Sequence, residues 1–122
     1  MTDRVVWFDL PVADLDRATK FYAAVLGIKV SKEKMGNFSF SVLEHGPEGN
    51  GGCLVPNAAE VGEKGPLIYL NVDGRIREAV KQAEKNGGKV LKAVESIGQH
   101  GFRAVIRDSE GNRVALHSAS DK

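Results

Sequence analysis

Residues 7–22, WFDLPVADLDRATKFY, decide the fold, because they carry the pattern of a strand that runs into an amphipathic helix. Residues 5–12 are largely apolar and β-rich, as expected of a strand covered on one side. Asp14 stands at a plausible N-cap, and Gly27 stands where a left-handed C-cap would end the helix. Between them the apolar residues recur at helical spacing: Leu15, Ala18, Phe21, Tyr22, Val25 and Leu26.

The same pattern occurs a second time further along the chain. FDLPV (8–12) and GIKV (27–30) bracket the first helical pattern, and IYLNV (68–72) and GGKV (87–90) bracket another, at an offset of 60 positions. EGN at 48–50 recurs at 110–112, an offset of 62, and a small difference in loop length accounts for the drift. The chain is therefore predicted to contain one module of about 60 residues twice.

Each module is predicted to be βαβββ. In the first module we expect further strands at 28–33, 37–44 and 51–55. In the second we expect a strand at 66–72, a helix near 75–86, and strands near 88–95, 101–107 and 112–118. We predict an α+β fold in a single domain of residues 1–122, in which the two modules form a curved mixed sheet around a cleft. The modules span about 1–56 and 66–119, with a linker at 57–65.

Composition narrows the classes of function. Apolar residues make up 42% of the chain, charged residues 27%, and the net charge is +1, which favours neither nucleic acid nor an anionic membrane as a partner. A single cysteine, Cys53, excludes an intrachain disulfide and fits a reducing compartment. MTDRVVW at residues 1–7 lacks the apolar run of a signal peptide. We therefore expect a cytoplasmic protein.

Strand alternation predicts which residues line the cleft. Phe8, Leu10 and Val12 would pack under the helix, which leaves Trp7 and Asp9 on the opposite face. The same alternation applies to the first strand of the second module and to the last strand of each module. A small-molecule ligand is therefore expected between Trp7, Asp9, Cys53, Tyr69, Arg113 and His117.

The paired βαβββ modules, the helix entry PVADLDRATKFYAAVLG and the terminal DSEGNRVALH resemble the vicinal oxygen chelate superfamily. The resemblance covers about residues 4–118. That superfamily includes glyoxalase I, extradiol dioxygenases, methylmalonyl-CoA epimerase, and fosfomycin- and bleomycin-resistance proteins. The chain looks closest to the small bacterial proteins loosely described as glyoxalase-related.

In the metal-using members, the resemblance implies one His, Gln or Glu ligand from the first and one from the last strand of each module. These ligands hold a divalent ion that acts as a Lewis acid. In this sequence the ligand positions of the metal-using members correspond to Trp7, Cys53, Leu67 and Ala115. Trp, Leu and Ala cannot ligate, and one Cys cannot hold a metal alone. We therefore expect a lost or altered metal site and no cofactor, while an alignment shift of two residues would bring in Asp9 and His117.

Three functions remain open at this point. The first is a glyoxalase-related protein that binds a small molecule without a metal. The second is a lyase or isomerase of glyoxalase type, which needs either a metal or an acid–base pair such as Asp9 and His117, with His117 as the general base. The third is an antibiotic-sequestering protein, for which an acidic cleft would suit a cationic ligand, although here Asp9 would be offset by Arg113. Whether the protein is an enzyme stays open.

Simpler roles exist for the same residues. His117 could form a hydrogen bond with solvent or with the backbone, and Asp9 could form an ion pair with Arg113. Trp7 could fill the volume that a metal and its water would otherwise occupy. Cys53 could be a buried inert thiol. The exposed strand edges of two half-barrels favour a homodimer.

Overall fold

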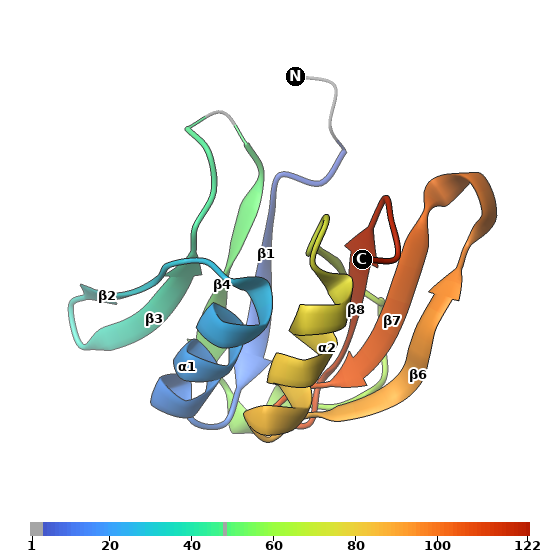
Figure 1. The fold of residues 1–122 in the computed structure, drawn as a ribbon. Helices are drawn as coiled ribbons and strands as arrows, with labels where there is room; N and C mark the ends of the chain where they lie inside the picture. The colour runs from blue at the N-terminus through green and yellow to red at the C-terminus, as the bar shows by residue number, and fades with distance from the viewer. Residues whose placement is uncertain (1–3, 48) are drawn as a thin grey trace.

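The computed structural model describes residues 4–47 and 49–122, and it contains two βαβββ modules (Figure 1). Module 1 consists of β1 (Trp7–Val12), α1 (Leu15–Leu26), β2 (Val30–Met35), β3 (Phe38–Leu43) and β4 (Gly51–Pro56). Module 2 consists of β5 (Tyr69–Asn71), α2 (Ile76–Lys85), β6 (Lys89–Ser96), β7 (Phe102–Arg107) and β8 (Arg113–Ser118). Two 3-10 turns, η1 (Ala58–Glu60) and η2 (Gly98–His100), lie in the connections. The predicted α+β class and the doubled βαβββ order are confirmed.

Each module forms its own four-stranded mixed sheet. The strand orders are β1-β4-β3-β2 and β5-β8-β7-β6, with the first pair of each sheet parallel. Asp9 pairs with Cys53 in module 1, and Tyr69 pairs with Ala115 in module 2. These two pairs occupy equivalent positions, because Tyr69 follows Asp9 by 60 residues and Ala115 follows Cys53 by 62. The sheet register therefore agrees with the two offsets of the sequence repeat.

Helix α1 follows the pattern that its sequence predicts. The Asp14 side chain accepts a hydrogen bond from the Arg17 N–H, and Gly27 ends the helix in the left-handed region with φ of 66°. The six apolar residues predicted from the spacing are the ones that are buried: Leu15, Ala18, Phe21, Tyr22, Val25 and Leu26. By contrast, β5 is shorter than its predicted span of 66–72, because regular pairing with β8 is confined to Tyr69–Asn71.

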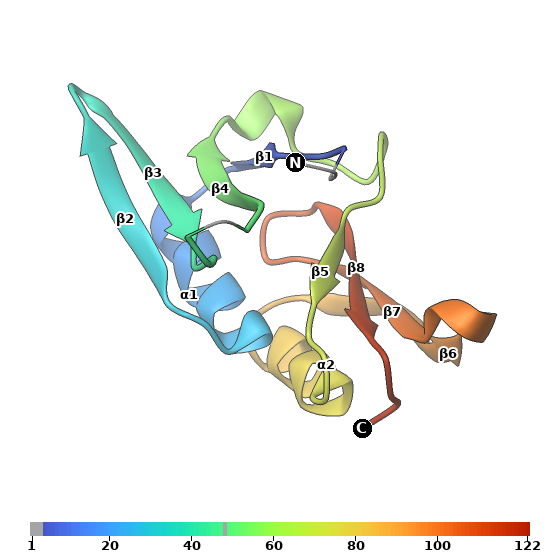
Figure 2. The ribbon, with the colours of Figure 1, turned by 90° about the horizontal axis from the view of Figure 1, so that it is seen from above.

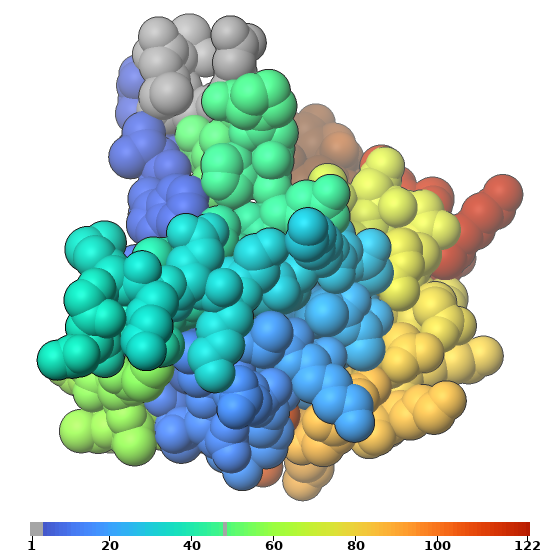
Figure 3. All heavy atoms as spheres, turned by 90° about the vertical axis from the view of Figure 1, so that its left-hand side faces the viewer, coloured from blue at the N-terminus to red at the C-terminus, as the bar shows by residue number. Residues whose placement is uncertain are grey.

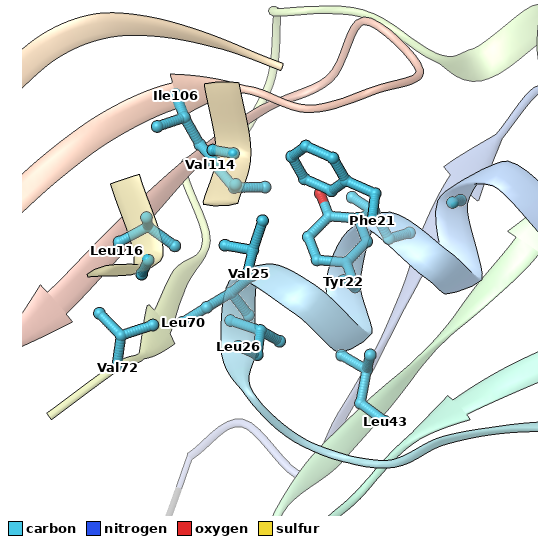
Figure 4. Close-up of a cluster of buried hydrophobic side chains, with 14 of the residues drawn as sticks. Phe21, Tyr22, Val25, Leu26, Leu43, Leu70, Val72, Ile106, Val114 and Leu116 are labelled. Carbon is cyan, nitrogen blue, oxygen red and sulfur yellow. The ribbon is translucent and has the colours of Figure 1, made fainter. Parts of the chain in front are cut away.

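Both helices lie on the same side of the molecule and pack against each other, and the sheets curve around them from either side (Figures 1 and 2). Side chains of α1 reach across to module 2, where Val25 and Leu26 lie among Leu70, Val72 and Leu116 in one shared core (Figure 4). The helix-free face of each sheet is therefore on the outside, and within one chain the two faces point away from each other. Neither helix in the described residues is long and apolar enough to cross a membrane.

Candidate functional site

The helix-free side of the β1-β4-β3-β2 sheet carries three of the predicted site residues, and we call it the module 1 outer face. Lys32 bonds to Asp16 of α1, so its neighbours on β2 point to the opposite side. By the same alternation, the face is mostly apolar, and aspartate and glutamate supply its charges. It includes Trp7, Asp9, Glu33, Met35, Phe38, Phe40 and Cys53. Figure 3 shows the β2–β3 hairpin, which carries part of this face, lying beside α1.

Asp9 and Cys53 contact each other on this face. The Cys53 thiol donates to Asp9 Oδ1 at 3.2 Å, and the Cys53 side chain is buried although Asp9 is exposed. Burial, followed by the hydrogen bond to Asp9, raises the pKa of the Cys53 thiol to about 11. A thiol with this pKa is protonated near neutral pH, so Cys53 is poorly suited to act as a nucleophile.

Trp7 lies at the edge of the same face and is 41% exposed. Its ring meets His45 edge to face, with 5.6 Å between the ring centroids. A side chain at position 51 would collide with both rings, since a Cβ on Gly51 would lie 2.8 Å from His45 and 3.1 Å from Trp7. Gly51 therefore allows the two rings to lie against β4, with part of the Trp7 ring left exposed.

Tyr69 and His117 lie together on the helix-free side of the β5-β8-β7-β6 sheet, the module 2 outer face. Their ring centroids are 6.5 Å apart, and both rings line a small open hollow with Ile97 and His100. The Tyr69 hydroxyl accepts a hydrogen bond from Arg103 at 2.6 Å. His117 Nε2 lies 2.6 Å from the backbone oxygen of His100, so it is held by the η2 turn at the tip of the hairpin.

Arg113 holds the linker between the modules. Its guanidinium donates to the Gly65 carbonyl at 3.0 Å, and its Nε is buried without a partner in the described structure. The ion pair between Asp9 and Arg113 that the sequence suggested is absent from the described residues. The structure therefore brings Asp9 to Cys53 and Tyr69 to His117, but it gives Asp9 no contact with His117 or Arg113 within one chain.

The donors available in one chain do not fit the metal site that the resemblance implies. Of the four carried-over positions, Trp7, Leu67 and Ala115 have no donor atom for a metal, and Cys53 is a buried protonated thiol. In residues 4–47 and 49–122 no three of His, Cys, Asp and Glu lie close enough together to hold an ion.

A buried polar network joins the two modules, and the sequence interpretation did not foresee it. Asp108 accepts hydrogen bonds from the Tyr22 hydroxyl at 2.5 Å and from the backbone of Glu110 and Asn112. Glu110 in turn accepts from Arg17 at 2.7 Å and from the backbone N–H groups of Ala13 and Asp14, at the start of α1. The terminal DSEGN motif carried the signal for this network.

A cavity of about 640 Å³ between the modules was also missed. It is lined by residues from β1, the C-terminal end of α1, the β3–β4 connection and the segment 66–71. Of the six predicted cleft residues only Tyr69 lines it. Its position follows from the way the two modules meet, which strand alternation alone does not reveal.

Comparisons with known proteins agree with this fold. A family model described as bleomycin resistance protein-like N-terminal matches residues 4–42. The chain is 31% identical to a glyoxylase-like domain-containing protein of Didymella fabae, over 88% of each chain. It is 28% identical to a lactoylglutathione lyase of Salmonella typhimurium, over 92% of this chain and 90% of that protein.

Among solved structures, a glyoxalase/bleomycin resistance protein from Albidiferax ferrireducens superposes with a TM-score of 0.74 at 17% identity, covering 95% of this chain and 98% of that one. This likeness shows the fold. Together with the similarity to the Didymella protein, it shows that the chain belongs to the glyoxalase/bleomycin resistance/dioxygenase family, the vicinal oxygen chelate superfamily.

Proposed function

We propose that this protein is a glyoxalase-related binding protein that works as a homodimer and holds a small, partly aromatic ligand without the metal chelate of its enzymatic relatives. The observation that carries the proposal is that two partly exposed aromatic rings, Trp7 and Tyr69, lie on the helix-free sides of two different sheets. A second copy that brings its module 2 outer face to the first copy's module 1 outer face would place both rings against one ligand.

The residue types support binding more than chemistry. Trp7 offers a flat ring for stacking, Asp9 a carboxylate, and His117 an imidazole. These are three of the six residues expected in the site, which also includes Cys53, Tyr69 and Arg113. The free Cys53 thiol is compatible with a reducing compartment, and the cytoplasmic location stays a prediction.

A cationic planar ligand is favoured by one specific observation. Within one chain Arg113 donates to Gly65 and does not neutralise Asp9, and the module 1 outer face carries Asp9 and Glu33 beside exposed aromatic rings. Carboxylates beside aromatic faces suit a planar cation through charge attraction and cation–π contact. This favours sequestration of a cationic compound over the glyoxalase-type reaction, which would need the acid–base pair of Asp9 and His117 to meet across the dimer.

The first experiment measures assembly and metal content. Sedimentation of the untagged protein, purified without chelators, should give a dimer, and mass spectrometry should find less than a tenth of an equivalent of bound metal. Titration of the stripped protein with Ni²⁺, Zn²⁺, Mn²⁺ and Fe²⁺ should then show no saturable site. A tightly held stoichiometric ion would overturn the metal-free proposal and favour the glyoxalase-type reaction.

Ligand binding is tested with thioflavin T, a planar cation whose fluorescence reports binding. Trp7→Ala should weaken its binding by roughly 2- to 12-fold, because a stacking contact contributes about 0.5–1.5 kcal/mol. His45→Ala should cost less, since His45 only supports the Trp7 ring from its edge. Equal losses in the two variants would show that the ligand site lies elsewhere.

A further inference from the structure

The cavity between the modules lies mainly on the helix side of the strands, and of the six residues predicted for the outer-face site only Tyr69 reaches it. Its lining is mostly apolar and includes Phe8, Leu26, Ile28, Leu43 and Ile68. Phe8 and Ile68 are on the helix side of their strands, opposite to Trp7 and Tyr69. Its volume of about 640 Å³ lies within the range that small-molecule sites occupy in proteins.

The internal repeat explains why this space is empty. In module 2 the residue that corresponds to Ile28 is Gly88. The Phe21 ring of α1 packs against Gly88, since a Cβ on Gly88 would lie 2.8 Å from that ring. Phe21 and its neighbour Tyr22 are buried, at 1% and 0% exposure. Their counterparts 60 residues on are Lys81 and Gln82, which lie at or near the surface of α2. The rings of Phe21 and Tyr22 thus fill one end of the molecule. At the other end α2 carries Lys81 and Gln82 at the equivalent positions, and the Phe8 ring forms part of the cavity wall.

The two turns that contain the Glu-Gly-Asn repeat, at 48–50 and at 110–112, also differ in the contacts that they make with the other module. In the β7–β8 turn, Asp108 and Glu110 bond to α1 of the other module. Gly46 stands at the position that corresponds to Asp108, and the residue that corresponds to Glu110 lies outside the described residues. Glu44, just before the β3–β4 turn, bonds to the Lys29 N–H of its own module at 2.9 Å. The described part of the β3–β4 connection forms one wall of the cavity, and Gly46 has no side chain with which to form a counterpart of the Asp108–Tyr22 bond.

The charge of the lining limits what can enter. Glu44 is the charged residue among those that line the cavity, and its carboxylate contacts the solvent at the rim. The lining as described contains no lysine, arginine or histidine. A negatively charged guest would therefore meet a carboxylate and apolar walls with no compensating cation, at a large desolvation cost. A neutral or cationic donor can instead hydrogen-bond to the Glu44 carboxylate while its apolar body fills the interior.

We propose that this cavity is a second binding site, which takes a small apolar molecule that carries a neutral or cationic amine and excludes the corresponding anion. The site can be tested apart from the ligand proposed for the outer faces, because Tyr69 belongs to both sites but the cavity residues Ile28, Glu44 and Ile68 belong to neither face.

The test uses two fluorescent probes with the same aromatic skeleton. N-phenyl-1-naphthylamine is neutral and carries one amine N–H, whereas 8-anilinonaphthalene-1-sulfonate adds a negative charge. The wild-type protein should bind the neutral probe at least tenfold more tightly than the sulfonate. Glu44→Gln should narrow that ratio, because it removes the negative charge at the rim.

Two substitutions at Ile28 identify the location. Ile28→Trp places a large ring in the cavity and should weaken binding of the neutral probe at least tenfold, while Ile28→Ala leaves the cavity open and should keep binding within about threefold. The matched control is Phe38→Ala on the module 1 outer face, which should leave the neutral probe unaffected. Thermal unfolding of each variant checks that the fold is retained.

The outcomes separate the two sites. If Ile28→Trp binds the neutral probe as tightly as wild type, the probe lies outside the cavity and the proposal is wrong. Loss of binding in Phe38→Ala together with retained binding in Ile28→Trp would place the probe on the module 1 outer face. Failure of wild-type protein to bind the neutral probe would overturn it as well. None of these results bears on thioflavin T binding at Trp7, so the proposed function stands or falls on its own measurements.

Discussion

Module 1 and module 2 share one topology but use equivalent positions differently. At the end of the molecule where α1 begins, the β7–β8 turn of module 2 is bonded into module 1 through Asp108 and Glu110. At the opposite end, Glu44 and Asn50 of the β3–β4 connection bond to Lys29 and Val5 of their own module. A repeated module thus does not imply a repeated interface. A few sequence differences between the modules produce a polar junction where α1 begins and a cavity at the opposite end.

The largest effect is expected where the polar junction is broken. Asp108→Ala should lower the free energy of unfolding by about 3 kcal/mol, because it removes the buried acceptor for Tyr22 and for the backbone N–H groups of Glu110 and Asn112. Urea unfolding followed by circular dichroism measures the change.

Gly46→Ala is the matched control in the other module. Position 46 corresponds to position 108, and a Cβ there would meet no atom within 4 Å. Its cost should stay within about 0.5 kcal/mol, as for other surface substitutions. Similar losses in the two variants would contradict the difference between the two ends.

Glu110→Gln should lower the free energy of unfolding by about 2 kcal/mol at pH 7, a smaller effect than that of Asp108→Ala. The substitution replaces a carboxylate that accepts hydrogen bonds from Arg17 and two backbone N–H groups with a neutral amide. Burial raises the pKa of Glu110, but hydrogen bonds from Arg17, the Asp14 backbone and Ser109 together lower it below its ordinary value of 4.5. The stabilisation is therefore fully present above about pH 4.5, and it is lost as the pH falls through the lower pKa of the folded state.

The pH dependence distinguishes this ion pair from a simple packing role. The difference in unfolding free energy between wild type and Glu110→Gln should shrink as the pH is lowered from 7 to about 3. A difference that stays constant over this range would show that the charge of Glu110 contributes nothing. Glu44→Gln, which removes a carboxylate from an exposed surface, should cost less than about 0.5 kcal/mol at pH 7.

The fold could be predicted from the sequence because it depends on local periodicity. The spacing of Leu15 to Leu26 indicated which side of α1 is buried, and alternation placed Trp7, Asp9 and Tyr69 away from the helices. The repeat offsets of 60 and 62 also predicted which positions correspond between the sheets, as the pairs Asp9–Cys53 and Tyr69–Ala115 show.

The site was harder to predict, because it depends on how separate elements meet. Alternation cannot show that Arg113 bonds to Gly65 of the linker instead of Asp9, since the path of the linker decides that contact. It also cannot show that the two sheets curve around the helices, which turns their outer faces apart. One sequence difference between the repeats does indicate the cavity. The helix of module 1 carries Phe21 and Tyr22 where the helix of module 2 carries Lys81 and Gln82, and only a residue-by-residue comparison of the two helices reveals this.

The smallest effect expected from a substitution is that of Asp9→Asn on Cys53, in the pair whose equivalent in module 2 is Tyr69–Ala115. Because the pKa of Cys53 is raised to about 11 from an ordinary value of 9.0, its reaction with a disulfide reagent at pH 8 should be roughly 100-fold slower than that of the unfolded chain. Asp9→Asn should speed the reaction a few-fold, because it removes the carboxylate that accepts from the thiol and disfavours the thiolate. The release of thionitrobenzoate, followed with time, measures both rates.

Tyr69→Phe is the control, because Tyr69 corresponds to Asp9 but lies beside Ala115 and bonds to Arg103. It should leave the rate at Cys53 unchanged. If Asp9→Asn and Tyr69→Phe had the same rate as wild type, the carboxylate would have no influence on the thiol, and burial alone would protect it. If the folded protein reacted as fast as the unfolded chain, Cys53 would be open to solvent and the module 1 outer face would have to be redrawn around an accessible thiol.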